Sequence, residues 1–312
     1  MQIHRDLNKL PQFKNAVITI GTFDGVHTGH QQIIQLLQTE AAEIGGETVL
    51  ITFHPHPKIV ITTARHEIKV LNTLEEKIRL LQKHGIDHLV VVPFTDAFAD
   101  QSAQDYIKDF LVAKFHPHTI IIGYDHRFGK ERKGDYHLLE AEAAANDYSV
   151  KEIPEHMLQD ITISSTKIRK ALLNADIETA NTFLGYPYFF SGKVIEGNKL
   201  GRTIGYPTAN LLITDEFKLI PGNGVYAVQV VRSESSVVRL KGMMNIGIRP
   251  TVDGSQRAIE VNIFDFDEEI YGEILTISIL QRLRSEVKFD GLESLKKQLA
   301  LDKQDAIKAL TN

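Results

Sequence analysis

The first half of the chain alternates short apolar runs with helical patterns, and this alternation constrains the fold more than any other feature of the sequence. The apolar runs lie at 17–20, 48–53, 88–92, 119–122 and 149–153, and the helical patterns lie between them at 31–44, 73–84, 102–114 and 136–146. The run at 119–122 is apolar without alternation, as expected for a strand covered on both faces. The order predicts a doubly wound α/β domain with a parallel sheet, whose ligands bind at the carboxyl ends of the strands.

The pattern changes after about residue 184. Alternating runs then follow at 189–195, 225–231, 237–244, 259–264 and 271–280, and a last helical pattern lies at 292–310. Short alternating runs separated by turn residues predict an antiparallel sheet or a small barrel. All 13 histidines lie between His4 and His156. Both changes predict two domains, at 1–184 and 185–312.

The composition argues against several classes of protein. The chain has 35 basic and 40 acidic residues, a net charge of −5, which gives no support for a nucleic-acid partner. Cysteine is absent, so disulfides and thiolate metal sites are excluded and a reducing cytoplasm is favoured. We expect no membrane partner, because no apolar run reaches about 18 residues. The sequence leaves a homo-oligomer open.

The segment from Gly21 to His30 reads GTFDGVHTGH and lies between a predicted strand and a predicted helix. Glycines let a backbone approach a ligand, and a helix N-terminus attracts anions, so this segment predicts a phosphate site. His27 and His30 share a face if the helix has begun. The segment fits neither of the two best-known phosphate-loop motifs. A zinc site on the two histidines would need a third ligand and is disfavoured.

Two further loops follow predicted strands. The segment at 54–58 reads HPHPK and comes after Phe53. Its two prolines predict an extended, stiff segment, which is either a rigid connector or a wall for a flat ligand. The loop at 123–134 has three glycines and four basic residues, Arg127, Lys130, Arg132 and Lys133. It is either a solvated basic loop or a phosphate-binding loop, and its place after a buried strand favours binding.

The segment ISSTKIRK begins at Ile163. Ser164 or Ser165 can cap a helix through its hydroxyl. A capped N-terminus with Arg169 one turn later is also an anion site.

Taken together, these motifs of the first half resemble a known enzyme family. The sequence His27-Thr-Gly-His30 resembles the signature of the nucleotidylyltransferase superfamily, and the wider set of motifs resembles the FAD synthetase module of bacterial bifunctional riboflavin kinase/FAD synthetases. The resemblance implies that FMN attacks the α-phosphorus of ATP and that pyrophosphate leaves. It implies that His27, His30 and Arg169 are catalytic. The implied ATP-site residues are Gly21, Phe23, Asp24, His27, His30, Asp125, Ser165, Thr166 and Arg169, and the implied flavin-site residues are Phe53, Pro55, Pro57 and Phe128.

Three features of the second half suggest chemistry. Thr208 and Asn210, in the segment GRTIGYPTAN, offer oxygen ligands suitable for Mg²⁺, or form a turn and a local cap. The segment at 245–251 reads NIGIRPT and is typical of a turn after a strand. Glu260 opens an otherwise apolar run, where it is either an ordinary exposed acid or a general base.

In this order the three features resemble riboflavin kinase. The resemblance implies a six-stranded β-barrel with a C-terminal helix. It implies that Glu260 is the catalytic base that takes the proton of the ribityl hydroxyl attacking the γ-phosphorus of ATP. The implied ATP-site residues are Gly201, Arg202, Gly205, Pro207, Thr208 and Asn210, of which Thr208 and Asn210 hold Mg²⁺. The implied flavin-site residues are Arg284, Phe289 and Leu295.

The sequence therefore predicts one enzyme with two active sites, both using ATP and Mg²⁺. The C-terminal site makes FMN from riboflavin and the N-terminal site makes FAD from FMN. Two alternatives stay open at this point. One module is inactive, or the chain is a non-catalytic flavin- or nucleotide-binding regulator. The presence of His27, His30 and Glu260 argues against a regulator, because a binder needs no base.

Overall fold

The computed structural model describes residues 1–123, 126–153, 163–197, 200–232, 238–251 and 254–311. It divides into two compact units, Met1–Ser164 and Ser165–Asn312. The division falls before residue 184, so the two helices α9 (Ser165–Leu173) and α10 (Ile177–Leu184) group with the second unit. Each unit is described by itself below.

The first unit is built on a six-stranded sheet in which every recorded pairing is parallel, as the alternation predicts. The strands in spatial order are β1 (Gln2–His4), β4 (His88–Pro93), β3 (Thr48–His54), β2 (Val17–Ile20), β5 (Thr119–Gly123) and β6 (Ser149–Ile153). The sequence analysis missed β1, a short edge strand. All four residues of β2 are buried, which explains why the continuous apolar runs identified the inner strands.

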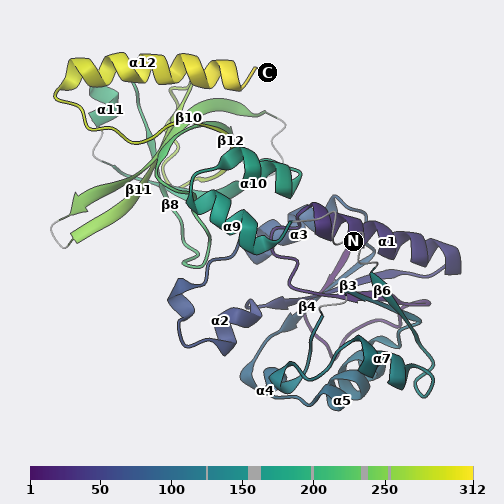
Figure 1. Cartoon of the computed structure of the whole chain (residues 1–312). Helices are drawn as coiled ribbons and strands as arrows, with labels where there is room; N and C mark the ends of the chain where they lie inside the picture. Colours follow the sequence, from purple (N-terminus) through teal and green to yellow (C-terminus); the bar gives the residue numbers. More distant parts are fainter. Residues whose placement is uncertain (124–125, 154–162, 198–199, 233–237, 252–253, 312) are drawn as a thin grey trace. The chain divides into compact units, whose positions relative to one another are not determined.

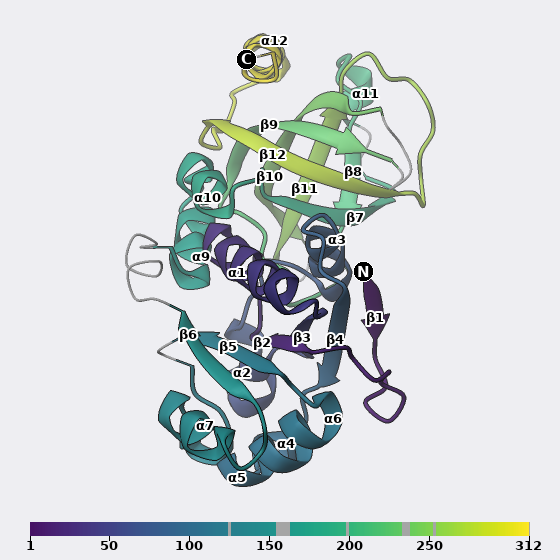
Figure 2. The same ribbon diagram turned by 90° about the vertical axis from the view of Figure 1, so that its right-hand side faces the viewer.

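Helices cover both faces of this sheet. They are α1 (Thr28–Ile44), α2 (Pro57–Ile61), α3 (Leu74–Gln82), α4 (Asp96–Ala99), α5 (Ala103–Asp105), a π-helical turn at Tyr106–Val112, α6 (Ala113–Phe115) and α7 (Tyr136–Ala143). In both views α1 and α3 lie on one face, and α4, α5 and α7 lie on the other (Figures 1 and 2). The predicted extended conformation at 54–58 is wrong from Pro57 onward, because Pro57 begins α2. Proline fits the first turn of a helix, where its missing N–H is not needed.

The strand order places a topological switch next to β2. From β2 the sheet continues through β3 in one direction and through β5 in the other. The crevice outside the carboxyl ends of such strands is where open α/β sheets bind ligands. The Gly21–His30 segment leaves β2 at this point.

The second unit contains a closed six-stranded barrel, which confirms the predicted architecture. Around the barrel the strands are β10 (Leu240–Thr251), β11 (Gly254–Ile263), β8 (Ala209–Leu212), β7 (Phe189–Ile195), β12 (Ile274–Arg284) and β9 (Gly224–Val231). This unit also has a short helix between β7 and β8, α11 (Leu200–Thr203), and a long helix after β12, α12 (Leu292–Ala309). α12 lies along the outside of the barrel (Figure 1). Its Ala306 and the following Leu310 join Ala227 and Met243 in one buried cluster.

Two local predictions for this unit are wrong. The segment at 245–251 is the second half of β10 and not a turn, and Glu260 lies inside β11 and not at its start. Both errors have one cause. β10 and β11 pair from Gly242↔Ile263 to Thr251↔Gly254, and this long antiparallel ladder overrides the turn propensity of asparagine, glycine and proline. No described helix of either unit is long and apolar enough to cross a membrane.

Candidate active sites

The loop between β2 and α1 has an unusual backbone. Phe23 and Val26 have φ values of +46° and +37°, in the left-handed region that side chains rarely adopt, and Gly25 has φ +90°. α1 begins at Thr28, so His27 is its N-cap residue, and no acidic residue lies in the first turn. The N-terminus of α1, which carries the positive end of the helix dipole, therefore has no carboxylate in its first turn that would compete with a bound anion.

His27 and His30 come together at the start of α1. Their rings stack with centroids 3.7 Å apart and planes 17° apart, and the Phe23 ring lies 4.9 Å from that of His30. Burial, and then the charges of His27 and Lys77, hold the pKa of His30 well below its usual value. His30 is therefore neutral near pH 7. Of the two roles open to it, a hydrogen-bond donor to phosphate fits better than a permanent cation.

Asp24 is engaged with the backbone of the same unit. The carboxylate is 1% exposed, and its Oδ1 accepts hydrogen bonds from the N–H groups of Leu71 and Asn72, at 2.9 and 3.3 Å. These N–H groups immediately precede α3. Asp24 thus ties the loop to the segment leading into α3, and its predicted ATP contact stays a prediction.

Aromatic side chains gather where β3 and β4 end. Phe53 is 8% exposed, and its ring lies 5.4 Å from Phe94 and 5.7 Å from Phe98. Phe128 is 6% exposed and stacks on Tyr106 at 4.8 Å. Pro55 is exposed beside this cluster and Pro57 is half-buried. These residues form an apolar region at the strand ends, and their predicted flavin contacts stay predictions.

The basic loop at 123–134 is partly neutralised. Lys130 pairs with Asp100 at 3.2 Å and Lys133 pairs with Glu131 at 2.6 Å. These two lysines therefore fit the solvated interpretation better than phosphate binding. Asp125, the nucleotide contact expected from this loop, lies outside the described residues.

The predicted phosphate residues Ser165, Thr166 and Arg169 stand on α9. α9 begins at Ser165, which puts Ser164 immediately before the helix, at the capping position. Because α9 belongs to the second compact unit, the structure does not place these three residues relative to His27 and His30.

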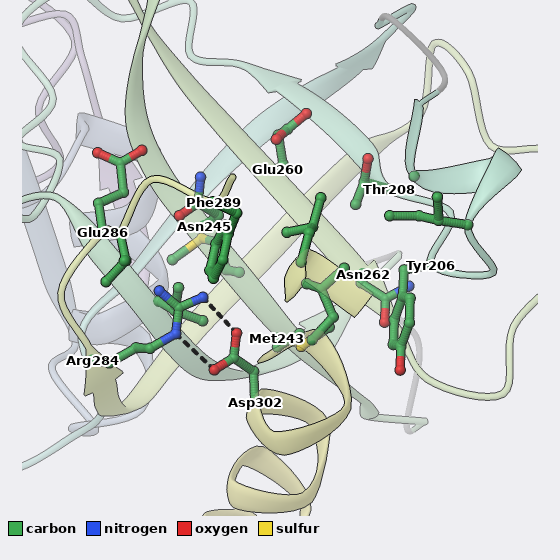
Figure 3. Close-up of a pocket in the computed structure, with 17 residues that line it drawn as sticks. Tyr206, Thr208, Met243, Asn245, Glu260, Asn262, Arg284, Glu286, Phe289 and Asp302 are labelled. Atoms are coloured by element: carbon green, nitrogen blue, oxygen red, sulfur yellow. Dashed lines mark hydrogen bonds and ion pairs between the residues drawn. The ribbon is translucent and has the colours of Figure 1, made fainter. Parts of the chain in front are cut away.

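A cavity of about 290 Å³ lies in the second unit (Figure 3). It brings together six residues that the sequence analysis singled out: Gly201, Thr208, Glu260, Arg284, Phe289 and Leu295. Tyr206, Met243, Asn245, Asn262, Glu286 and Asp302 also line it. Four predicted residues are not among those that line the cavity: Arg202, Gly205, Pro207 and Asn210. The first three are exposed, and Asn210 is half-buried on β8.

Strand register sets the polar wall of this cavity. Glu260 of β11 lies directly opposite Asn245 of β10 on one side and Asn210 of β8 on the other. Residues directly opposite each other in a sheet project to the same face. The neighbours Ile259 and Val261 are buried on the opposite face. The barrel therefore presents an acid between two amides, which explains why Glu260 interrupts an apolar run.

Asn262 holds the segment that contains Thr208. Its side-chain Nδ2 donates to the carbonyl of Pro207 at 2.7 Å. Asn262 also lines the cavity, so this contact lies beside it.

Gly197 approaches the side-chain amide of Asn210 so closely that a side chain at position 197 would displace this amide. A Cβ at position 197 would lie nearer to the Asn210 amide than real Cβ contacts ever come. Gly197→Ala should therefore displace Asn210 and lower riboflavin phosphorylation, without affecting adenylyl transfer to supplied FMN. Gly272→Ala is the matched control for phosphorylation, although its φ of +83° adds strain, because nothing lies within 4 Å of its added Cβ. Equal phosphorylation rates in the Gly197→Ala variant and the wild type would contradict the packing argument.

Arg284 and Asp302 join the end of β12 to α12. Nε and Nη2 of Arg284 donate to the two carboxylate oxygens of Asp302 at 2.7 and 2.6 Å (Figure 3). The Asp302 side chain is 2% exposed, and the Phe289 ring lies 5.8 Å from the guanidinium. Bidentate pairs of this kind fix geometry as well as charge. The predicted flavin residue Arg284 is therefore held in place by an acid that the sequence analysis missed.

Asp302→Ala should destabilise the second unit, because it leaves the Arg284 guanidinium without its carboxylate. We expect a loss of about 2–3 kcal/mol in the free energy of unfolding, somewhat below the value for a fully buried pair because Arg284 retains some solvent access. Denaturant unfolding of the variant measures this loss. Asp305→Ala, on an exposed position of the same helix, is the control. A change below about 0.5 kcal/mol, typical of surface substitutions, would show that the pair adds little.

Comparison with known proteins identifies both halves. Residues 9–167 match the family model described as FAD synthetase, and residues 184–310 match the one described as riboflavin kinase. A bifunctional riboflavin kinase/FMN adenylyltransferase from Listeria monocytogenes is 41% identical over 93% of this chain and 91% of its own length. The Bacillus subtilis protein of the same name is 39% identical, over 95% and 93%.

One solved structure is similar along the whole chain. It is a crystal structure from Streptococcus pneumoniae described as a macrolide-efflux protein, with a TM-score of 0.85 and 31% identity, covering 97% of each chain. That description applies to that protein. On the strength of the two family models and the curated relatives, the chain belongs to the family of bifunctional riboflavin kinase/FMN adenylyltransferases.

Proposed function

We propose that this chain makes FMN in its second unit, with Glu260 as the base. Glu260 takes the proton from the terminal ribityl hydroxyl of riboflavin. The oxygen attacks the γ-phosphorus of ATP, the bond from this phosphorus to the β,γ-bridging oxygen breaks, and ADP leaves. The observation that supports this assignment is the pairing register of β11 and β8, which sets Glu260 opposite Asn210. Glu260 and Thr208 both line the cavity. Phosphoryl transfer depends mainly on positioning and charge neutralisation, and a strand fixes positions more tightly than a loop.

We also propose that Thr208 and Asn210 hold Mg²⁺ with the phosphates of ATP. A hydroxyl and an amide oxygen are hard ligands, and Mg²⁺ in such sites is commonly completed by water and substrate oxygens. The described residues contain no cluster of three or more acidic, histidine or cysteine ligands, so a site completed by phosphate is the type that fits. When bound, the ion would supply positive charge to the phosphates.

For the first unit we propose that the loop at Gly21 to His30 binds the phosphates of ATP while FMN attacks the α-phosphorus. His27 and the neutral His30 would donate hydrogen bonds to the oxygens on which charge builds up, a role that suits preorganised donors in an enclosed site. Ser165, Thr166 and Arg169 would bind the leaving pyrophosphate, and Phe53, Pro55, Pro57 and Phe128 would contact the flavin. Because both reactions consume ATP, we place the enzyme in the cytoplasm.

A product assay tests the proposal. The purified protein is incubated with riboflavin, ATP and Mg²⁺, and the flavins are separated by chromatography. FAD is the expected end product, and FMN is its intermediate. FMN alone would show that only the kinase is active. If neither product forms, a second incubation with FMN and ATP tests the adenylyltransferase by itself. Excess EDTA should stop both reactions, and unaffected phosphorylation would contradict the Mg²⁺ assignment.

A further inference from the structure

A lysine is buried beneath the phosphate loop of the first unit. Lys77, on α3, is only 6% exposed, although lysine is almost never fully buried without a partner. Its Nζ donates to the carbonyl of Thr22 at 2.6 Å and to Oγ1 of Thr52 at 3.3 Å. Thr22 belongs to the loop and Thr52 to β3. Both partners are neutral, so the burial of this charge needs an explanation beyond an ion pair.

α3 and the segment immediately before it both form hydrogen bonds with the loop. Lys77 donates to the Thr22 carbonyl, and two residues later Asp24 accepts from the N–H groups of Leu71 and Asn72. Between and after these contacts the chain adopts the left-handed conformations at Phe23 and Val26. Strained backbone persists only where its surroundings fix it, and this double attachment supplies the fixation.

The ammonium also acts on one candidate catalytic histidine, His30. Its charge lowers the pKa of His30, in addition to the larger effect of burial. Burial in turn lowers the pKa of Lys77 to about 8, and the charge of Asp24 opposes this shift. Among the described residues, two titratable groups interact electrostatically with Lys77: Asp24 from the loop and His30 from α1. The partner from β3, Thr52, is neutral.

From this geometry we propose that Lys77 is a positioning residue for adenylyl transfer: its buried ammonium fixes the loop through the Thr22 carbonyl and so aims His27 and His30 at the phosphates of ATP. The proposal rests on the assignment of that loop to the adenylyltransferase site. It assigns Lys77 no contact with substrate.

The test compares Lys77→Met with Lys77→Arg in the full-length protein, with FMN and ATP as substrates. Loss of the ammonium should lower kcat on the order of 10- to 100-fold, as small displacements of catalytic groups do. Lys77→Arg should restore part of the loss, because arginine keeps the charge and the donors. Riboflavin phosphorylation by the same preparations should stay at the wild-type rate. Lys83→Met, at the exposed end of α3, should change neither reaction.

The pH profile separates positioning from simple stability. In the wild type, Lys77 loses its proton as the pH rises through about 8, so kcat for FAD formation should fall there. Lys77→Met should lack this decline. The titration of His30 lies on the acid side and cannot produce it. A kcat within twofold of the wild type, or an unchanged alkaline decline in Lys77→Met, would overturn the proposal.

A milder variant covers the case in which Lys77→Met does not fold. Thr52→Val keeps the ammonium but removes one of its two acceptors, so the alkaline decline should move to lower pH. An unmoved decline in Thr52→Val would also overturn the proposal. Failure of the phosphate-loop assignment is distinguishable, because His30→Ala would then make FAD at the wild-type rate whatever the Lys77 variants do.

Discussion

Glu260→Gln should slow riboflavin phosphorylation at least about 100-fold while FAD synthesis from supplied FMN continues. Glutamine keeps the size of glutamate but cannot accept the proton of the ribityl hydroxyl. General bases contribute about 100- to 10,000-fold to a rate, so we expect kcat for FMN formation to fall within that range. Single-turnover formation of FMN, followed by chromatography, measures the change.

The design of the experiment contains its own controls. FAD formation from FMN by the same preparation shows that the first unit is intact. Glu269→Gln replaces an exposed acid between β11 and β12 and should leave phosphorylation unchanged. If Glu260→Gln phosphorylated riboflavin at the wild-type rate, another group would be the base. A raised KM for riboflavin with unchanged kcat would likewise exclude the base assignment, because it indicates lost binding only.

His30→Ala should have the opposite effect. The substitution removes a ring that stacks on His27 at 3.7 Å and, in our proposal, a hydrogen-bond donor to the reacting phosphates. Removing one such donor costs about 100- to 1,000-fold in kcat. FAD formation from FMN should therefore fall by this factor, and phosphorylation of riboflavin should persist.

The lowered pKa of His30 gives this prediction a second test. Burial keeps the folded-state pKa below the usual value, so the ring stays neutral as the pH rises from 6.5 to 7.5. A mechanism that needs a protonated His30 predicts a fall of about tenfold over this interval, because the protonated fraction falls about tenfold per pH unit above the pKa. Adenylyl transfer should show no such fall, and loss of the Lys77 proton near pH 8 should lower it by far less here. His137→Ala, with a side chain 85% exposed, is the control. Wild-type FAD synthesis in His30→Ala would remove His30 from the mechanism.

The inner strands and the longer helices could be predicted because burial leaves a direct pattern. Continuous apolar runs predicted β2 to β5, and period-two runs with turn residues predicted most of the barrel. β1 has three residues, two of them exposed, and carries too little pattern. The prediction of a turn at 245–251 was wrong for a different reason. Its residues favour a turn locally, and only the long pairing with β11 holds them in a strand.

The two missed charged residues share one explanation. Charged side chains on helices are usually solvated, so composition gives no reason to select Lys77 or Asp302. Their spacing does contain a signal. Lys77 lies three residues after the buried Leu74 and four before the buried Leu81, on the apolar face of α3. Asp302 is similarly placed four residues before the buried Ala306. A charge on the apolar stripe of a helix is a candidate for a buried partner.

The ladder between β8 and β11 has a consequence for how this enzyme can change over evolution. Only two residue pairs join these strands, Glu260↔Asn210 and Val261↔Ala209. Because side chains alternate between faces, inserting or deleting one residue in β8 would turn Asn210 into the barrel and bring an apolar neighbour to the cavity. Lineages of this enzyme should therefore keep the length of the segment between Thr208 and Leu212 constant.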